Sequence, residues 1–62
     1  MSPIIRLSPR RFAVLCQYAS PHRNHLTIIE LRVTHSHSKA EQLARRFPLS
    51  PRAVRYLEAA HQ

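Results

Sequence analysis

The sequence contains no glycine and no tryptophan, and it has a single cysteine among its 62 residues. Without glycine there is no glycine-rich loop of the kind that cradles a phosphate group. One cysteine cannot form an intrachain disulfide, so a secreted domain stapled by disulfides is excluded and a reducing cytoplasm is the expected compartment. A chain this short forms one domain and buries only about 60% of the surface that its unfolded form exposes. We therefore expect a marginal core, completed by a bound partner or by a homodimer.

Acidic residues and long apolar runs are also scarce. The longest unbroken apolar run, Phe12 to Cys16, is far shorter than the roughly 18 to 20 residues that cross a bilayer, so no membrane segment is expected. The N-terminus has no extended apolar stretch typical of a secretory signal, and no targeting segment is expected either. The three carboxylates fall in different predicted elements and form no acid–base pair; they are Glu30, Glu41 and Glu58. The chain is also too short to enclose a substrate cavity, so the sequence predicts no enzyme and no cofactor.

Positive charge is abundant, because ten Lys and Arg residues face only three acidic ones and give a net charge of +7. Nine of the ten cations are arginines. The planar guanidinium group makes paired hydrogen bonds to phosphate or to guanine, which lysine cannot match. The charge therefore predicts a polyanionic partner, with nucleic acid ahead of a membrane surface.

The first half of the chain has the two-residue period of β-strands. Residues 1–11 form a basic arm or a short edge strand, and residues 12–35 form a β-hairpin of two alternating runs. A polar segment from Pro21 to His25 separates the two strands and is expected to form the turn. Within it, Asn24 is the residue best suited to a left-handed conformation. An isolated hairpin is unstable in water. Another element must cover its apolar face, which in the second run carries Ile29, Leu31 and Val33.

The last third of the chain has the period of helices. Ser38 and Glu41 have the spacing of a capping box, which predicts a helix from Lys39. Its apolar stripe contains Ala40, Leu43, Ala44 and Phe47. Pro48 ends this helix, and Ser50 followed by Pro51 starts a second one that runs to about residue 60. The predicted fold class is α+β: one domain over residues 1–62, with an N-terminal β-hairpin followed by two short helices over 38–60 in a helix-turn-helix-like arrangement.

The segment from Ser38 to Leu57, SKAEQLARRFPLSPRAVRYL, resembles the helix-turn-helix of DNA-binding regulators. In such a unit the small Ala44 would let the helices cross closely over an apolar interior, here Leu43, Leu49, Val54 and Leu57. Pro48 stands at the turn position where the family usually has glycine with a positive φ, so the turn itself must differ. The resemblance implies that the second helix enters the major groove of double-stranded DNA.

The same resemblance implies roles for individual side chains. Arg52 and Arg55 would contact base edges beside Tyr56, and phosphates would be held by Arg45, Arg46 and Ser50. The function implied is that of a small DNA-binding transcriptional regulator of phage or plasmid type. The structural alternative is a plain helical hairpin whose arginines are only solvated.

Two further resemblances give different functions. A strand followed by two helices is similar to the ribbon-helix-helix proteins, in which Glu30, Arg32 and Thr34 would lie in the major groove of DNA. The run from Arg32 to Phe47 also looks like small phage accessory proteins, including the Icd-like division inhibitors. That resemblance implies a protein that binds and inhibits a host protein, whose acidic surface would match this basic chain.

The histidines form two sequence pairs, His22 with His25 and His35 with His37. In the predicted hairpin the pairs lie about 30 Å apart, at roughly 3.3 Å per residue, so they cannot bind one ion. The sequence therefore predicts no metal site. Cys16 alternates with apolar residues and is expected to be a buried, unreactive thiol.

Overall fold

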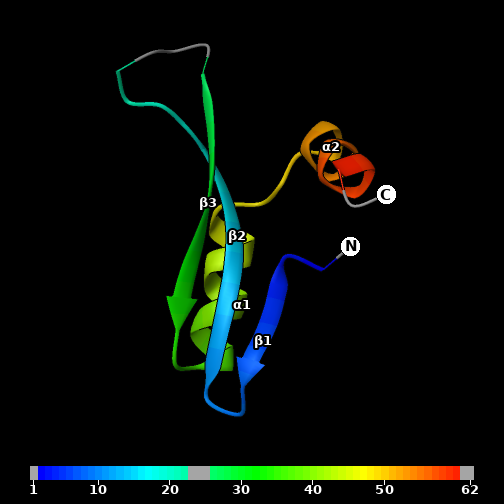
Figure 1. Cartoon of the computed structure of the whole chain (residues 1–62). Coiled ribbons are helices and arrows are strands. Elements are labelled where there is room, and N and C mark those ends of the chain that lie inside the picture. The colour runs from blue at the N-terminus through cyan, green and yellow to red at the C-terminus, as the bar shows by residue number, and fades with distance from the viewer. Residues whose placement is uncertain (1, 23–25, 61–62) are drawn as a thin grey trace.

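A computed structural model describes residues 2–22 and 26–60 of the chain (Figure 1). In order along the chain the elements are β1 (Ile4–Ser8), β2 (Arg11–Ala19), β3 (Thr27–Thr34), α1 (His37–Arg46) and α2 (Pro51–Ala60). The predicted α+β class, with strands followed by two helices, is confirmed. Of the two alternatives for the N-terminal residues, the structure has the edge strand, so the sheet contains three strands. The predicted turn residue Asn24 lies outside the described residues.

The sheet is antiparallel with the order β1-β2-β3, so β2 is the central strand. Phe12 of β2 stands between Arg6 of β1 and Thr34 of β3, and Val14 stands between Ile4 and Arg32. Successive side chains of a strand point to opposite faces, so the even-numbered residues of β2 share one face with the even-numbered residues of both neighbours. The odd-numbered residues form the other face.

Helix α1 covers the even-numbered face and creates the core (Figure 1). The buried members of this core come from β2 and from α1; they are Phe12, Val14, Cys16 and Ala40. The predicted apolar stripe of the helix is confirmed, because Leu43, Ala44 and Phe47 pack against that core. The small Ala40, which has no exposed surface, lets the helix axis approach the sheet.

The N-terminus of α1 differs from the prediction by two residues. Ser36, not Ser38, is the N-cap, and its hydroxyl accepts a hydrogen bond from the Lys39 amide at 3.3 Å. The Thr34 hydroxyl donates to the carbonyl of Ser36 at 2.9 Å and so fixes the turn that leads into the helix. Glu41 does not reach back to a cap; its Oε1 lies 2.9 Å from Nδ1 of His37, one helical turn earlier.

The orientation of β3 also differs from the prediction. Its polar residues Glu30, Arg32 and Thr34 are on the side of α1, opposite Cys16, Val14 and Phe12. The apolar residues Ile29, Leu31 and Val33 are on the uncovered face. The physical reason is the junction with α1: Thr34 must face the helix side to bond the backbone of Ser36, and the period of two then fixes every other residue of the strand.

The connection between the helices runs past the edge of β2. Phe47 caps α1 with φ −126° and ψ 65°, and its carbonyl accepts a hydrogen bond from the Gln17 amide at 3.3 Å. Pro48 thus ends α1 as predicted, and α2 begins at Pro51 and ends at Ala60, also as predicted. Neither helix of the described part of the chain is long enough to span a bilayer.

The two helices do not pack against each other. No Cα atom of α2 lies within 8 Å of α1 or of a strand, and Figure 1 shows α2 standing away from the sheet and α1. The interhelical contact expected at Ala44 is absent because Leu43 and Ala44 are used on the sheet instead. Over residues 2–22 and 26–60 no backbone φ is positive, so the turn typical of a helix-turn-helix does not form around Pro48.

Candidate nucleic-acid interface

Helix α2 carries its cations on the side that faces solvent. Residues three and four apart share a side of a helix, which groups Arg52 with Arg55 and Tyr56. All three are exposed, and Tyr56 retains 74% of its accessible surface. The half-buried residues of α2 lie on the other side of the helix; they are Ala53, Val54 and Leu57. The free face predicted for this helix, with two arginines and a tyrosine, is therefore available to a ligand.

Gln17 of the central strand holds the first turn of α2 in place. Its side-chain Oε1 accepts a hydrogen bond from the Ser50 amide at 2.7 Å, and its Nε2 donates to the Ser50 hydroxyl at 3.4 Å. The same hydroxyl accepts from the Ala53 amide at 3.1 Å, which makes Ser50 the N-cap that the sequence predicts. Ser50 thus has a structural role in positioning Arg52, in addition to the phosphate contact predicted for it.

The end of α1 places two more cations near this helix. Arg45 and Arg46 occupy the last turn of α1 and are exposed. The guanidinium carbon of Arg46 lies 5.5 Å from the centroid of the Phe47 ring, a cation–π distance. Four residues separate Arg46 from the start of α2 at Pro51, so the structure brings the predicted phosphate-binding pair to the same end of the molecule as α2.

Arg32 is placed differently from the helical arginines. Its Nε donates to Oε1 of Glu30 at 3.1 Å, and its guanidinium carbon lies 5.8 Å from the Phe47 centroid. Hydrogen bonds from Tyr18 and then from Arg32 lower the pKa of Glu30, and the bond to Glu30 raises the pKa of Arg32. The Tyr18 phenol also has a raised pKa because it shares its hydrogen with Glu30. Arg32 therefore forms an exposed ion pair with Glu30 and lies over Phe47, at the end of α1.

The ion pairs of the described residues leave the helical arginines free. They are Arg32 with Glu30 and His37 with Glu41, the second being charged when His37 is protonated. No arginine of α1 or α2 takes part in either pair. Solvated, unpaired guanidinium groups keep their full charge for a polyanion, because no intramolecular partner has to be displaced first.

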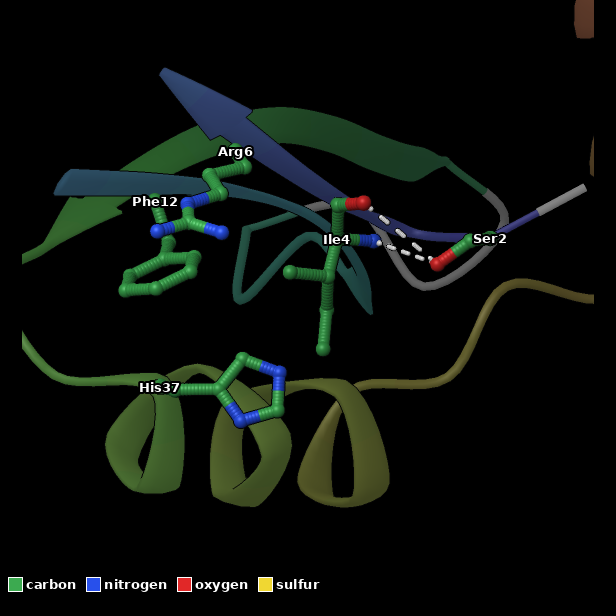
Figure 2. A pocket seen from close by; sticks show the side chains of 5 residues that line it. All are labelled: Ser2, Ile4, Arg6, Phe12 and His37. Carbon is green, nitrogen blue, oxygen red and sulfur yellow. Dashed lines mark hydrogen bonds between the residues drawn. The ribbon is translucent and has the colours of Figure 1, made fainter. Parts of the chain in front are cut away.

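A hollow of about 470 Å³ lies between β1 and the start of α1. Figure 2 shows its lining: His37 rises from α1 toward Ile4, while Arg6 and Phe12 lie above it on the sheet. The rings of Phe12 and His37 meet edge to face at 5.2 Å. Arg6 adds a cation at this second position, which lies on β1 rather than on a flexible arm.

Metal-binding and nucleophilic groups are not gathered at any of these places. Within residues 2–22 and 26–60, His, Cys, Asp and Glu side chains form no group of three or more that could hold a metal ion. His25, one member of a predicted histidine pair, lies outside the described residues. Cys16 is fully buried beneath α1, and this burial raises the pKa of its thiol, which disfavours the nucleophilic thiolate.

No motif in the sequence marks Gln17, which bonds Ser50 at the start of α2. A single amide side chain at the end of an apolar run was the only signal for a polar contact at that edge. The solvent-facing position of the apolar row in β3 was also missed. Both rows of β2 are mostly apolar, so hydrophobic alternation alone could not decide which face α1 covers.

Comparisons of this chain with protein-family models, with curated proteins and with solved structures found no match.

Proposed function

We propose that the chain is a small DNA-binding protein that contacts duplex DNA through α2 and the end of α1, and that it acts as a transcriptional regulator of phage or plasmid type. The observation that supports this most strongly is the set of exposed arginines in α1 and α2 that take part in no ion pair within residues 2–22 and 26–60. Its members are Arg45, Arg46, Arg52 and Arg55. The proposal is for a binding protein without catalysis.

Helix α2 is free enough to enter a groove. The major groove of B-DNA is about 12 Å wide and admits one helix, provided that no other element crowds it. The body of the protein leaves this space, since no Cα atom of α1 or of the sheet lies within 8 Å of α2. Arg52 and Arg55 would contact base edges, and Tyr56 would contact the sugar-phosphate backbone beside them.

Arg45 and Arg46 would position the protein on the backbone. Their guanidinium groups project from the last turn of α1 and carry no sequence information in this arrangement. Arg32 would contribute through the same end of the molecule only after release from Glu30. The regulator would act in the cytoplasm as a homodimer, which would let two copies of α2 bind two half-sites.

A second candidate function is the binding and inhibition of an acidic host protein. It is supported by the net charge of +7 and by the outer edge of β3, a row of backbone groups to which a partner strand could add. In that case the cations would steer the encounter with an acidic surface.

The first test is a titration of the protein with fluorescent duplex DNA at two salt concentrations. The two arginine–phosphate contacts proposed for Arg45 and Arg46 predict that the affinity falls roughly 10-fold between 50 and 200 mM salt. A protein that fails to bind duplex DNA even at low salt would eliminate the DNA proposal and leave the host-protein candidate.

The second test compares two double variants that remove the same charge. Arg52→Ala with Arg55→Ala should weaken binding by at least about 10-fold and abolish any sequence preference. Arg10→Ala with Arg11→Ala removes two cations at the β1–β2 turn and should change the affinity much less. If both variants bound alike, α2 would not be the recognition element; if only loss of Arg32 abolished binding, the ribbon-helix-helix alternative would be correct.

A further inference from the structure

The face of the sheet opposite α1 is apolar and uncovered. Its row of cross-strand neighbours runs from Ile5 through Ala13 to Val33, and the next row pairs Leu15 with Leu31. Leu31 is 59% exposed, Val33 50% and Ile5 46%. We call this surface the open face; it consists of Ile5, Leu15, Ile29, Leu31 and Val33, which surround the buried Ala13.

The size of the open face exceeds what isolated surface residues would give. With Ile29 at 37%, these four side chains present roughly 330 Å², which is at the lower end of the range for the largest patch on a typical monomer, often a functional one. A standard protein interface takes about 600 to 1,000 Å² from each partner. Together with Leu15, with the backbone between the side chains and with Leu7 at 53% exposure on the same edge strand, the open face approaches that requirement.

The layering of the molecule indicates that a second layer is missing. The Cα atoms span 36 × 30 × 14 Å, so the chain is a thin plate of one sheet and one helix. A sheet with two apolar faces has to bury both, and only the even-numbered face is buried by α1. Helix α2 does not supply the cover, because it only borders the open face, where Gln17 and Ile29 line a hollow of about 290 Å³ with Arg52 and Tyr56 of the helix.

We propose that the open face is the surface through which two copies of this chain associate, sheet against sheet. The distribution of charge favours a second copy of the chain over an acidic partner protein as the molecule that covers this face. Among the odd-numbered positions of β2 and β3 only Arg11 is charged, at the end beside the β1–β2 turn. An acidic partner protein would find no cationic groups at the centre of this face, whereas two identical apolar faces are complementary to each other.

Stacked sheets pack about 10 Å apart with their side chains interdigitated. Such packing would bury the open faces in the middle of the dimer and leave each α1, with Arg45 and Arg46, on the outside. The cationic ends of the two copies would then remain accessible, and their mutual repulsion would stay small because solvent and salt lie between them. The DNA proposal uses other side chains, although Ile29 of the open face lines one hollow with Arg52 and Tyr56, so the two surfaces adjoin.

The test is size-exclusion chromatography with light scattering on the full chain without DNA. The wild-type protein should have twice the mass of one chain. Leu31→Lys should shift it to monomer, with a dissociation constant raised by at least about 10-fold, because the substitution buries a charge without a partner. Gln42→Lys adds the same charge on the exposed side of α1 and should remain a dimer.

Circular dichroism on each variant separates loss of association from loss of folding. Should Leu31→Lys unfold, Ile5→Lys on edge strand β1 carries the same prediction of a folded monomer. A wild-type chain that is monomeric at all concentrations would overturn the proposal, and so would one that binds vesicles of anionic phospholipid as a monomer. A Leu31→Lys protein that is folded and still dimeric would overturn it as well.

Discussion

Helices α1 and α2 have the same length of ten residues and both have one apolar side, yet their environments are opposite. Helix α1 lies along the sheet and buries Ala40 completely, while α2 buries no residue. Helix α1 ends in two arginines, of which Arg46 lies over the ring of Phe47, and α2 has an arginine one residue after Pro51. Helix α1 completes the core, and α2 exposes its arginines to solvent.

This difference shows how a short chain divides its residues between stability and binding. Isolated helices of ten residues are marginal in water, so most of the stability of α1 comes from the packing of its apolar side. Helix α2 lacks that packing and depends on its N-cap Ser50, on Pro51 at the first helical position and on the tether to Gln17. We therefore expect α2 to order further when a ligand binds to it.

The largest expected effect comes from placing the same carboxylate in each helix. Ala40→Glu would bury an unpaired charge under the sheet, and we expect it to cost roughly 3–5 kcal/mol of unfolding free energy, a large part of the total for so small a domain. Ala59→Glu lies on exposed α2 and should cost less than about 1 kcal/mol. Denaturant unfolding followed by circular dichroism measures both, and equal losses would show that the two helices do not differ as described.

A smaller effect is expected from cutting the tether between Gln17 and α2. Gln17→Ala removes the acceptor of the Ser50 amide, a bond of 2.7 Å worth about 0.5–1.5 kcal/mol. Hydrogen exchange of the Val54 amide, which bonds Ser50, should become roughly 3- to 10-fold faster, while amides of α1 keep their rates. Gln42→Ala on the exposed side of α1 is the matched control and should leave Val54 unchanged. Faster exchange throughout the molecule would mean that Gln17 supports the whole fold rather than α2 alone.

The sequence predicted most of the fold because local signals agreed with one another. The alternation in β2, the stripe from Ala40 to Phe47 and the start at Ser50 each have a direct physical cause, and the structure has all three. The start of α1 was wrong by two residues because Ser36 and Ser38 are both suitable caps. Thr34 decides between them through its bond to Ser36, a contact that depends on the strand register.

The parts that the sequence could not predict depend on long-range contacts. The position of α2 is determined by Gln17, which is 33 residues away from Ser50 in the chain. The open face exists because the odd-numbered residues of β3 point away from α1. The alternation of polar and apolar residues in β3 would be the same if these residues pointed toward α1, so the alternation alone does not predict the open face. The exposed arginines of α2 were predictable because helical spacing alone places Arg52, Arg55 and Tyr56 together. Their role in binding stays a prediction.

The central claim, that α1 is the structural helix and α2 the binding helix, is tested most directly by NMR. Amide shifts of the labelled full chain would be followed during titration with duplex DNA at low salt. We expect the shift changes to concentrate in α2 around Arg52 and Arg55 and at Arg45 and Arg46, with the open face around Leu31 unaffected. Changes confined to β3, or no change at all on addition of DNA, would contradict it.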